Sequence, residues 1–168
     1  MSKKIVVTGG LGYIGTELCK IYSGESWRNQ ITVVDNRFVS ERVNQLRNWS
    51  INFVHSDIRD LENVKQFLKE ADVIHHLAGI TDVARTKEES NLGKDKEMND
   101  IAEKGTSVVL SESSENCKII FPSSHVVFEG KEKMEENIEE DHEKFPVLSY
   151  GLGKDKNEEQ IKKSGKNY

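Results

Sequence analysis

Residue types that transfer protons in enzymes occur close together in the last third of the sequence. Tyr150 and Lys154 are four residues apart, which places them on one face of a helix, and Ser123 and Ser124 follow an apolar run. A lysine ammonium beside a tyrosine favours the phenolate and lowers the pKa of the phenol. Such a pair together with a serine forms a proton-transfer site. The Tyr–Lys spacing alone also arises by chance, so its meaning depends on where the serines lie.

A glycine-rich turn near the start of the sequence has the spacing of a dinucleotide-binding site. Gly9, Gly12 and Gly15 lead from an apolar run into a segment of helical period, and Asp35 follows about 20 residues later. These glycines permit a tight turn, the approach of a pyrophosphate and close helix packing. The helix N-terminus attracts the anion, while the carboxylate hydrogen-bonds the ribose hydroxyls. We therefore predict an NAD site, in which Asp35 repels the 2′-phosphate of NADP.

Several neighbouring residues have two interpretations each. Arg37 could accept the 2′-phosphate of NADP, but an exposed loop cation is the simpler interpretation. Asp57 and Ile58 either cover the adenine or begin the turn into a helix. His75 and His76 are neighbours on a strand and point to opposite faces, so they cannot easily share a metal ion. We expect packed or hydrogen-bonded histidines and no metal site.

The elements that must position these residues alternate along the chain, as in a parallel sheet covered by helices. We predict strands at residues 5–8, 31–35, 52–55, 73–77 and 118–122, and helices at 13–22, 40–48, 61–69, 94–113 and 148–163. Asp60 is the expected N-cap of the third helix, and Gly165 ends the last. Ligands of open α/β sheets bind at the carboxyl ends of the strands. The predicted fold is a doubly wound Rossmann domain over residues 1–168.

Length and composition limit the class of protein. The 168 residues are 35% hydrophobic and 32% charged, which suits one core but is short for two. The net charge of −5 disfavours nucleic-acid and anionic-lipid partners, and no segment is long enough to span a bilayer. Cys19 and Cys117 show no disulfide or zinc pattern, which favours a reducing, cytoplasmic setting. The acidic, lysine-rich stretch 129–144 has little to bury and is predicted to be an exposed, mobile loop.

The motifs together resemble the N-terminal part of extended short-chain dehydrogenases/reductases, in the NAD-dependent epimerase/dehydratase family. The similar segments, in family order, are the glycine turn at 8–15, Val34-Asp35-Asn36, His76-Leu77-Ala78-Gly79, residues 123–128 and residues 146–154. By this resemblance Tyr150 is the acid/base, Lys154 holds the nicotinamide ribose and tunes Tyr150, and Ser124 hydrogen-bonds the reacting group. The expected cofactor contacts are Gly9, Gly12, Tyr13, Ile14, Gly15, Asp35, Asn36, Asp57, Ile58, Leu77, Ala78, Gly79, Tyr150 and Lys154.

Family members use NAD to take a hydride from a nucleotide sugar and return it after epimerisation or elimination. The sequence departs from their pattern in that Ala102 stands where an Asn is usual, with Asn99 one helical turn earlier. Glu129 before a glycine is a feature of dTDP-4-dehydrorhamnose reductases, which keeps an NADPH-dependent reductase open as an alternative. A catalytically silent NAD-binding module is a second alternative.

The chain ends at Tyr168, where a sixth strand is expected to begin. We expect the family's C-terminal substrate domain to be missing, with little turnover of nucleotide sugars by this chain alone. An open sheet edge would also favour self-association into a homo-oligomer.

Overall fold

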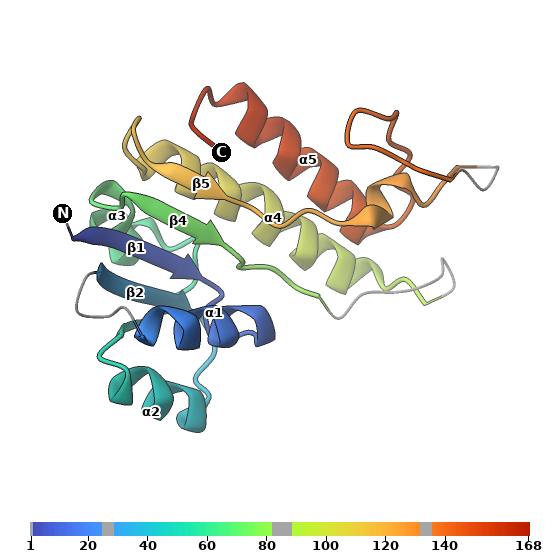
Figure 1. The fold of residues 1–168 in the computed structure, drawn as a ribbon. Coiled ribbons are helices and arrows are strands. Elements are labelled where there is room, and N and C mark those ends of the chain that lie inside the picture. Colours follow the sequence, from blue (N-terminus) through green and yellow to red (C-terminus); the bar gives the residue numbers. More distant parts are fainter. Residues whose placement is uncertain (1, 25–28, 82–88, 132–135) are drawn as a thin grey trace.

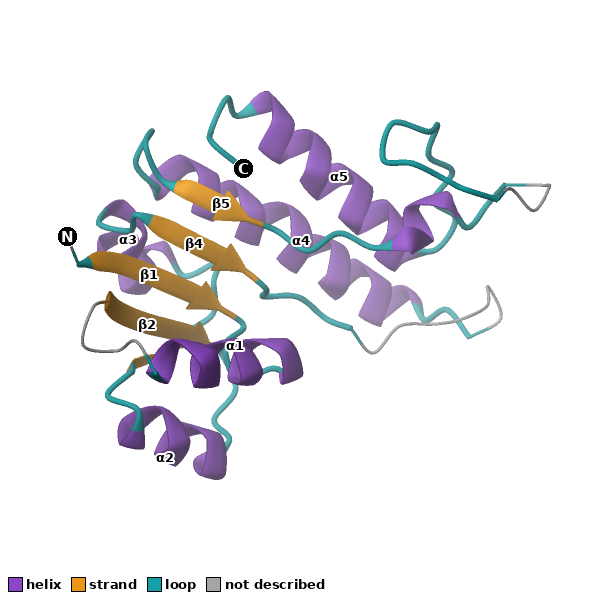
Figure 2. Cartoon of the chain, in the orientation of Figure 1, coloured by secondary structure: helices purple, strands orange, loops and turns teal. Residues whose placement is uncertain are grey.

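The computed structural model describes residues 2–24, 29–81, 89–131 and 136–168. A parallel sheet of five strands, in the order β3-β2-β1-β4-β5, has helices on both faces (Figure 1 and Figure 2). The strands are β1 (Lys3–Thr8), β2 (Asn29–Asp35), β3 (Asn52–His55), β4 (Val73–His76) and β5 (Lys118–Ile120). The helices are α1 (Tyr13–Ser23), α2 (Ser40–Asn48), α3 (Leu61–Lys69), α4 (Leu92–Glu112), the short 3₁₀ helix η1 (His125–Phe128) and α5 (Ser149–Lys163). The predicted doubly wound α/β fold is confirmed.

Alternating strand residues divide the core into two layers, one on each face of the sheet. On one face, Val7 packs with Cys19 of α1 and Leu46 of α2. On the other face, Val6 packs with residues of α3 and with Val109 of α4. Because helices cover both faces, the strands are apolar on both sides and appear in the sequence as continuous apolar runs. The sheet is thus a rigid platform for the loops at its ends.

Several element boundaries differ from the prediction by one or two residues, and two of these differences have identifiable reasons. β5 ends at Ile120, because Pro122 has no N–H to donate to a strand ladder. α4 begins two residues earlier than predicted, because the Asn91 side chain caps it and accepts hydrogen bonds from Gly93 N and Lys94 N at 3.1 and 3.2 Å.

The predicted cap of α3 is correct in position but not in its hydrogen bond. Asp60 is the N-cap residue, yet its side chain makes no capping bond. Its Oδ2 accepts instead from Asn63 Nδ2 at 2.5 Å. The capping role was inferred from residue type, and the rotamer that decides it depends on the neighbouring side chain.

The chain returns to the sheet after α5. Gly165 has a φ of 69°, the left-handed conformation expected for the residue that ends a helix. The Asn167 carbonyl then accepts a hydrogen bond from Ile119 N at 2.8 Å, within a parallel bridge between Asn167 and Lys118. The chain therefore begins to pair beside β5 at the place where the sequence predicts a sixth strand.

The described parts of the stretch 129–144 contain no helix or strand, as predicted, whereas residues 132–135 lie outside the described residues. The expectation that this stretch buries little is wrong at its end. The Lys144 side chain is 15% exposed and pairs with Asp155 and Glu158 of α5. The mobility of the rest stays a prediction.

Among the described residues, no helix combines the length and apolar character needed to cross a membrane. Cys19 and Cys117 are both free thiols and both buried. Burial raises the pKa of each, which makes them unreactive as thiolates.

Candidate functional site

A pocket of about 780 Å³ runs across the carboxyl ends of the strands. It is lined by segments that follow each of the five strands and by the start of α5. All the expected cofactor contacts lie on its wall, namely Gly9, Gly12, Tyr13, Ile14, Gly15, Asp35, Asn36, Asp57, Ile58, Leu77, Ala78, Gly79, Tyr150 and Lys154. Ser124 is not among the lining residues, whereas Ser123 is. The fold thus collects into one cavity residues that are far apart in the sequence.

The glycine turn between β1 and α1 forms the middle of this wall. Gly9 has a φ of 67° and donates its N–H to the Val34 carbonyl at 2.7 Å. Gly12 is the N-cap of α1 and provides no side-chain cap, so the helix N-terminus is not covered by its own N-cap residue. A Cβ atom on Gly15 would lie 2.6 Å from the Cα of Gly10, so the turn can close only with glycine there. The pattern of glycines follows from these close approaches.

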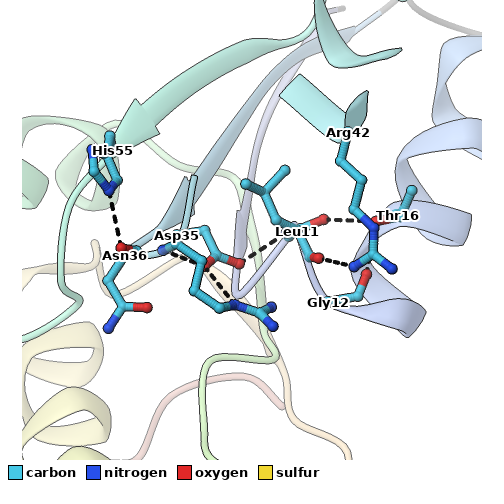
Figure 3. Close-up of polar contacts among 9 residues, drawn as sticks. Leu11, Gly12, Thr16, Asp35, Asn36, Arg42 and His55 are labelled. Atoms are coloured by element: carbon cyan, nitrogen blue, oxygen red, sulfur yellow. Dashed lines mark hydrogen bonds and ion pairs between the residues drawn. The ribbon is translucent and has the colours of Figure 1, made fainter. Parts of the chain in front are cut away.

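Asp35 ties the glycine turn to the end of β2. Its side chain is 3% exposed, and Oδ2 accepts from Leu11 N at 2.9 Å (Figure 3). Oδ1 accepts from Arg37 N at 2.9 Å. The Arg37 guanidinium also lies 3.4 Å from Oδ1. Asp35 therefore holds the turn in shape in addition to facing the pocket, a structural role that sequence reasoning missed.

Two arginines surround this end of the pocket. Arg37 is an exposed loop cation, as predicted, with a side chain 57% exposed, and it also forms an ion pair with Asp35. Arg42 of α2 donates to the Leu11 carbonyl (Figure 3). Both arginines line the pocket, so positive charge accompanies the Asp35 carboxylate.

Asp57 begins the turn into α3 and also lines the pocket, so its contact with the adenine stays a prediction. Its carboxylate accepts from Arg59 Nε at 2.9 Å and Nη2 at 2.7 Å, and its carbonyl accepts from Asp60 N at 3.0 Å. Arg59 reaches across to Asp100 of α4 at 2.7 Å. The hydrogen bond from Arg59 is the main reason that the pKa of Asp57 is lowered. Arg59 was missed, although an arginine two residues after the aspartate was a visible signal.

The two histidines of β4 point to opposite faces, as predicted. His75 Nε2 lies 2.7 Å from the Tyr22 hydroxyl of α1. His76 is enclosed on the other face between Thr8, 2.9 Å from Nδ1, and Thr106, 3.0 Å from Nε2. Within the described part of the chain, no group of three or more His, Cys, Asp or Glu residues could hold a metal ion.

Hydrogen bonds link His76 to the pocket wall through Thr8. Thr8 Oγ1 lies 2.9 Å from His76 Nδ1 and accepts from Ala78 N at 3.1 Å, and Thr106 Oγ1 lies 3.0 Å from His76 Nε2. This chain connects the core to Ala78, a residue of the pocket wall.

We predict that His76 makes the protein lose stability between about pH 6.5 and pH 4. Burial lowers the pKa of His76 from 6.5 to about 4, with a further contribution from the charge of Lys154. Below pH 6.5 the histidine is therefore protonated in the unfolded chain but stays neutral in the folded chain. The free energy of unfolding falls by up to about 3 kcal/mol as a result. Urea unfolding at a series of pH values measures this slope.

His76→Asn is the test variant for this experiment. His125→Asn is the matched control, because His125 is exposed. His76→Asn should flatten the slope between pH 6.5 and 4, whatever its effect on absolute stability. An unchanged slope in His76→Asn would show that other groups cause the acid sensitivity.

Tyr150 and Lys154 lie side by side at the β5 end of the pocket. The Lys154 ammonium donates to the Pro122 carbonyl at 2.7 Å, is 4.4 Å from the centre of the Phe121 ring and is 5.6 Å from that of Tyr150. Burial lowers the pKa of Lys154 to about 8, against an opposing contribution from Glu158. These contacts follow from the four-residue spacing of Tyr150 and Lys154 on α5 and from the segment after β5, which lies beside this helix.

The expectation that Lys154 lowers the pKa of Tyr150 is wrong for this state of the protein. Burial raises the pKa of Tyr150 instead. The physical reason is that the Lys154 ammonium is directed to the Pro122 carbonyl, so its charge does not offset the loss of water around the phenol. Tyr150 is accordingly protonated here.

The two serines have separate environments. Ser124 is the N-cap residue of η1, and its side chain makes no capping hydrogen bond. The Ser123 hydroxyl donates to Glu158 of α5. Ser124, which is expected to act in the pocket, does not line it, whereas the preceding residue, Ser123, does.

Glu129 has a structural role that sequence reasoning did not identify. Its Oε1 accepts from Val147 N at 3.0 Å and Leu148 N at 2.7 Å, immediately before α5. These bonds hold the start of the helix that carries Tyr150. These hydrogen bonds explain the presence of Glu129, so the residue does not distinguish a reductase from an epimerase or dehydratase.

Asn99 does not replace the usual asparagine of the fourth helix in the pocket. Its Oδ1 is buried without a hydrogen-bond partner among the described residues, and Asn99 does not line the pocket. A Cβ atom on Gly153 of α5 would lie 3.7 Å from that oxygen and 3.5 Å from the Ala102 methyl. Both residues belong to the contact between α4 and α5.

The model of the 3-beta hydroxysteroid dehydrogenase/isomerase family matches residues 6–167. A UDP-glucose 4-epimerase from Neisseria meningitidis serogroup C is 31% identical over 138 residues, which are 75% of this chain and 38% of that protein. A UDP-glucose 4-epimerase from Bifidobacterium longum, solved with NAD⁺ and UDP, has a TM-score of 0.77 and 25% identity, covering 95% of this chain and 48% of that one. An L-threonine dehydrogenase from Clostridium difficile has a TM-score of 0.80 and 24% identity, covering 97% and 49%. The chain thus spans half or less of the length of these proteins.

Proposed function

The chain belongs to the 3-beta hydroxysteroid dehydrogenase/isomerase family, in the epimerase/dehydratase group of short-chain dehydrogenases/reductases, and we propose that it is the cofactor-binding part of an NAD-dependent nucleotide-sugar epimerase or dehydratase. One observation carries this proposal. A continuous pocket joins Asp35, the glycine turn and the Tyr150–Lys154 pair. Its location at the carboxyl ends of parallel strands is the usual ligand site of this fold. We propose that residues 1–168 form one domain around it.

The residues present fit a dinucleotide. Gly9, Gly12 and Gly15 line the pocket without side chains, and a Cβ atom on Gly12 would meet the Gly9 carbonyl at 3.1 Å. In the proposal, the start of α1 holds the pyrophosphate, Asp35 holds the adenosine ribose, and Asp57 with Ile58 borders the adenine. When bound, NAD supplies a carbon that accepts a hydride and returns it.

The proposed roles at the Tyr150–Lys154 end of the pocket follow from which groups carry a proton. Tyr150 holds the proton that a sugar hydroxyl exchanges, and Lys154 presents its ammonium to the ribose and to Tyr150. For Tyr150 to act as a base, Lys154 must leave the Pro122 carbonyl and approach the phenol, because the charge then favours the phenolate. Ser124 hydrogen-bonds the reacting group only if its side chain turns into the pocket. Catalytic hydrogen bonds often tighten in this way when a ligand binds.

We propose a nucleotide sugar as the substrate because the Neisseria relative is a UDP-glucose 4-epimerase and the Bifidobacterium protein was solved with UDP. Assays with UDP-glucose, UDP-galactose, GDP-mannose and dTDP-glucose, each with NAD and NADP, test this choice. L-Threonine is included because a dehydrogenase of that amino acid has the same fold. Turnover of L-threonine alone would overturn the substrate class.

An NADPH-dependent reductase is the second candidate, and one observation favours it. Arg37 and Arg42 line the same end of the pocket as Asp35, and a guanidinium can bind a 2′-phosphate. Because Arg37 is paired with Asp35, we place NAD first. Competition between the two cofactors decides between the candidates.

We predict that the chain binds NADH more tightly than NADPH and that Asp35→Asn reduces this preference. The substitution removes the charge that repels a 2′-phosphate and the charged hydrogen bond to the ribose, which together change the NADH/NADPH affinity ratio by about tenfold or more. Asparagine can still accept the hydrogen bond from Leu11 N, so the turn keeps one contact. Titration calorimetry with both cofactors measures the ratio.

Asp141→Asn is the control, because the Asp141 side chain is 89% exposed and lies outside the pocket. It should leave both affinities unchanged. Equal or tighter NADPH binding by the parent chain would overturn the preference for NAD.

A further inference from the structure

The Glu158 carboxylate connects three segments behind the Tyr150–Lys154 pair. One oxygen accepts the hydroxyl of Ser123, which follows β5. The other accepts from Lys144 Nζ at 2.7 Å, and Lys144 belongs to the loop before α5. The side chains of Glu158 and Lys144 are only 19% and 15% exposed. A loop, a strand end and a helix are therefore tied together at one half-buried carboxylate.

Glu158 is ionised in this arrangement. Burial alone would raise its pKa, but the hydrogen bonds from Lys144 and Ser123 bring it below its usual value. An ionised carboxylate only accepts hydrogen bonds, so the single hydroxyl hydrogen of Ser123 is directed to Glu158. The backbone that follows β5 is thereby fixed against α5.

Glu158 also acts on the lysine of the pocket. It lies four residues after Lys154 on α5, which places both side chains on one face of the helix. Its negative charge opposes the effect of burial on the pKa of Lys154. Among the described residues, the other titratable groups near the ammonium are Tyr150 on the same helix and His76 on β4, and both are neutral. Glu158 is thus the counter-charge that acts on Lys154.

Both effects meet at one short stretch of backbone. Lys154 donates to the carbonyl of Pro122, and the next residue is Ser123, which Glu158 holds. A change at Glu158 therefore alters the position of this backbone and the charge environment of Lys154 at once.

On the basis of the proposed function, we propose that Glu158 is a positioning residue: held by Lys144, it fixes Ser123 and the backbone after β5 against α5 and provides the counter-charge for Lys154. It acts through Lys154 and Ser123 and does not itself line the pocket. Lys144 is its support and completes the arrangement from the loop before α5.

The test compares Glu158→Gln with Glu159→Gln, two identical changes at neighbouring positions of α5. Glu159 is 47% exposed, and its ion pair within the described part of α5 is with Lys163 at 3.4 Å, so its variant controls for the loss of one negative charge. The Lys154 titration is followed by NMR of the lysine side chains in the free protein. Glu158→Gln should lower the pKa of Lys154 by about one unit, whereas Glu159→Gln should leave it unchanged.

Two further variants separate positioning from simple loss of packing. Glu158→Asp keeps the charge on a shorter side chain and should restore most of the Lys154 pKa, although it loosens the contact with Ser123. Lys144→Met removes the support but no negative charge, so it should weaken NADH binding about fivefold without lowering the pKa of Lys154. These variants also decide the question if Glu158→Gln does not fold.

The inference is overturned if Glu158→Gln and Glu159→Gln shift Lys154 equally, or if Glu158→Asp has the same effect as Glu158→Gln. The proposed function fails separately, if the parent chain binds no NADH. In that case a Lys154 shift specific to Glu158→Gln would still support the coupling, because that titration is measured without cofactor.

Discussion

Whatever turnover of nucleotide sugars this chain shows is expected to fall by about 10²- to 10⁴-fold when Tyr150 is replaced by Phe, while NADH binding stays nearly unchanged. Phenylalanine keeps the ring that lies 5.6 Å from the Lys154 ammonium and removes only the hydroxyl. Because that hydroxyl is the group proposed to hold the exchanged proton, its loss should affect the chemical step and spare cofactor affinity. Stopped-flow measurement of cofactor reduction, with protein and substrate at comparable concentrations, detects even slow turnover.

Tyr168→Phe is the matched control for this change. Tyr168 is 63% exposed and lies outside the pocket, so its variant should behave like the parent chain. A measurable parent rate that Tyr150→Phe leaves unchanged would remove Tyr150 from the mechanism. A large loss of NADH affinity in Tyr150→Phe would instead assign the residue to binding.

Gly9→Ala is expected to destabilise the fold by about 3 kcal/mol or more. The φ of 67° is strained for any residue with a Cβ, which costs about 1–3 kcal/mol. The added atom would also lie 2.8 Å from backbone atoms of Leu77 and Ala78, and these cannot move aside as a flexible side chain can. Forcing such a contact costs about 1–3 kcal/mol more. Guanidinium chloride unfolding measures the change.

Gly79→Ala provides the comparison for Gly9→Ala. Gly79 lines the same pocket, but a Cβ atom there would have no atom within 4 Å. Its free energy of unfolding should change by no more than about 0.5 kcal/mol. Similar losses for both variants would mean that the turn is not constrained as the structure indicates.

Local signals in the sequence were sufficient for the elements and for the outline of the site. The bounds of β3, α2 and α3 agree with the prediction residue for residue. Apolar periodicity reports which face of an element is buried, and that property is set by neighbouring residues. Gly9 and Asp35 were recognisable for the same reason, because a turn and the end of the next strand impose their residue types locally.

Contacts between distant residues were beyond such signals. Nothing in the residue types around Ser123 and Ser124 distinguishes the serine that lines the pocket from the one that begins η1. The direction of each side chain depends on where the strand ends, and β5 ends at Ile120. The role of Glu129 likewise requires the backbone of Val147, 18 residues away.

The sequence by itself determined the parallel α/β fold, the glycine turn, Asp35 at the end of β2 and the shared helix face of Tyr150 and Lys154. Only the tertiary structure decided that burial keeps Tyr150 protonated, that Lys154 turns to the Pro122 carbonyl, and that Lys144 is buried against Glu158. The physical reason is that the charge state of a group depends on its loss of water and on the partners around it. Both are properties of the packed chain, because they are set by side chains that folding brings together from separate segments.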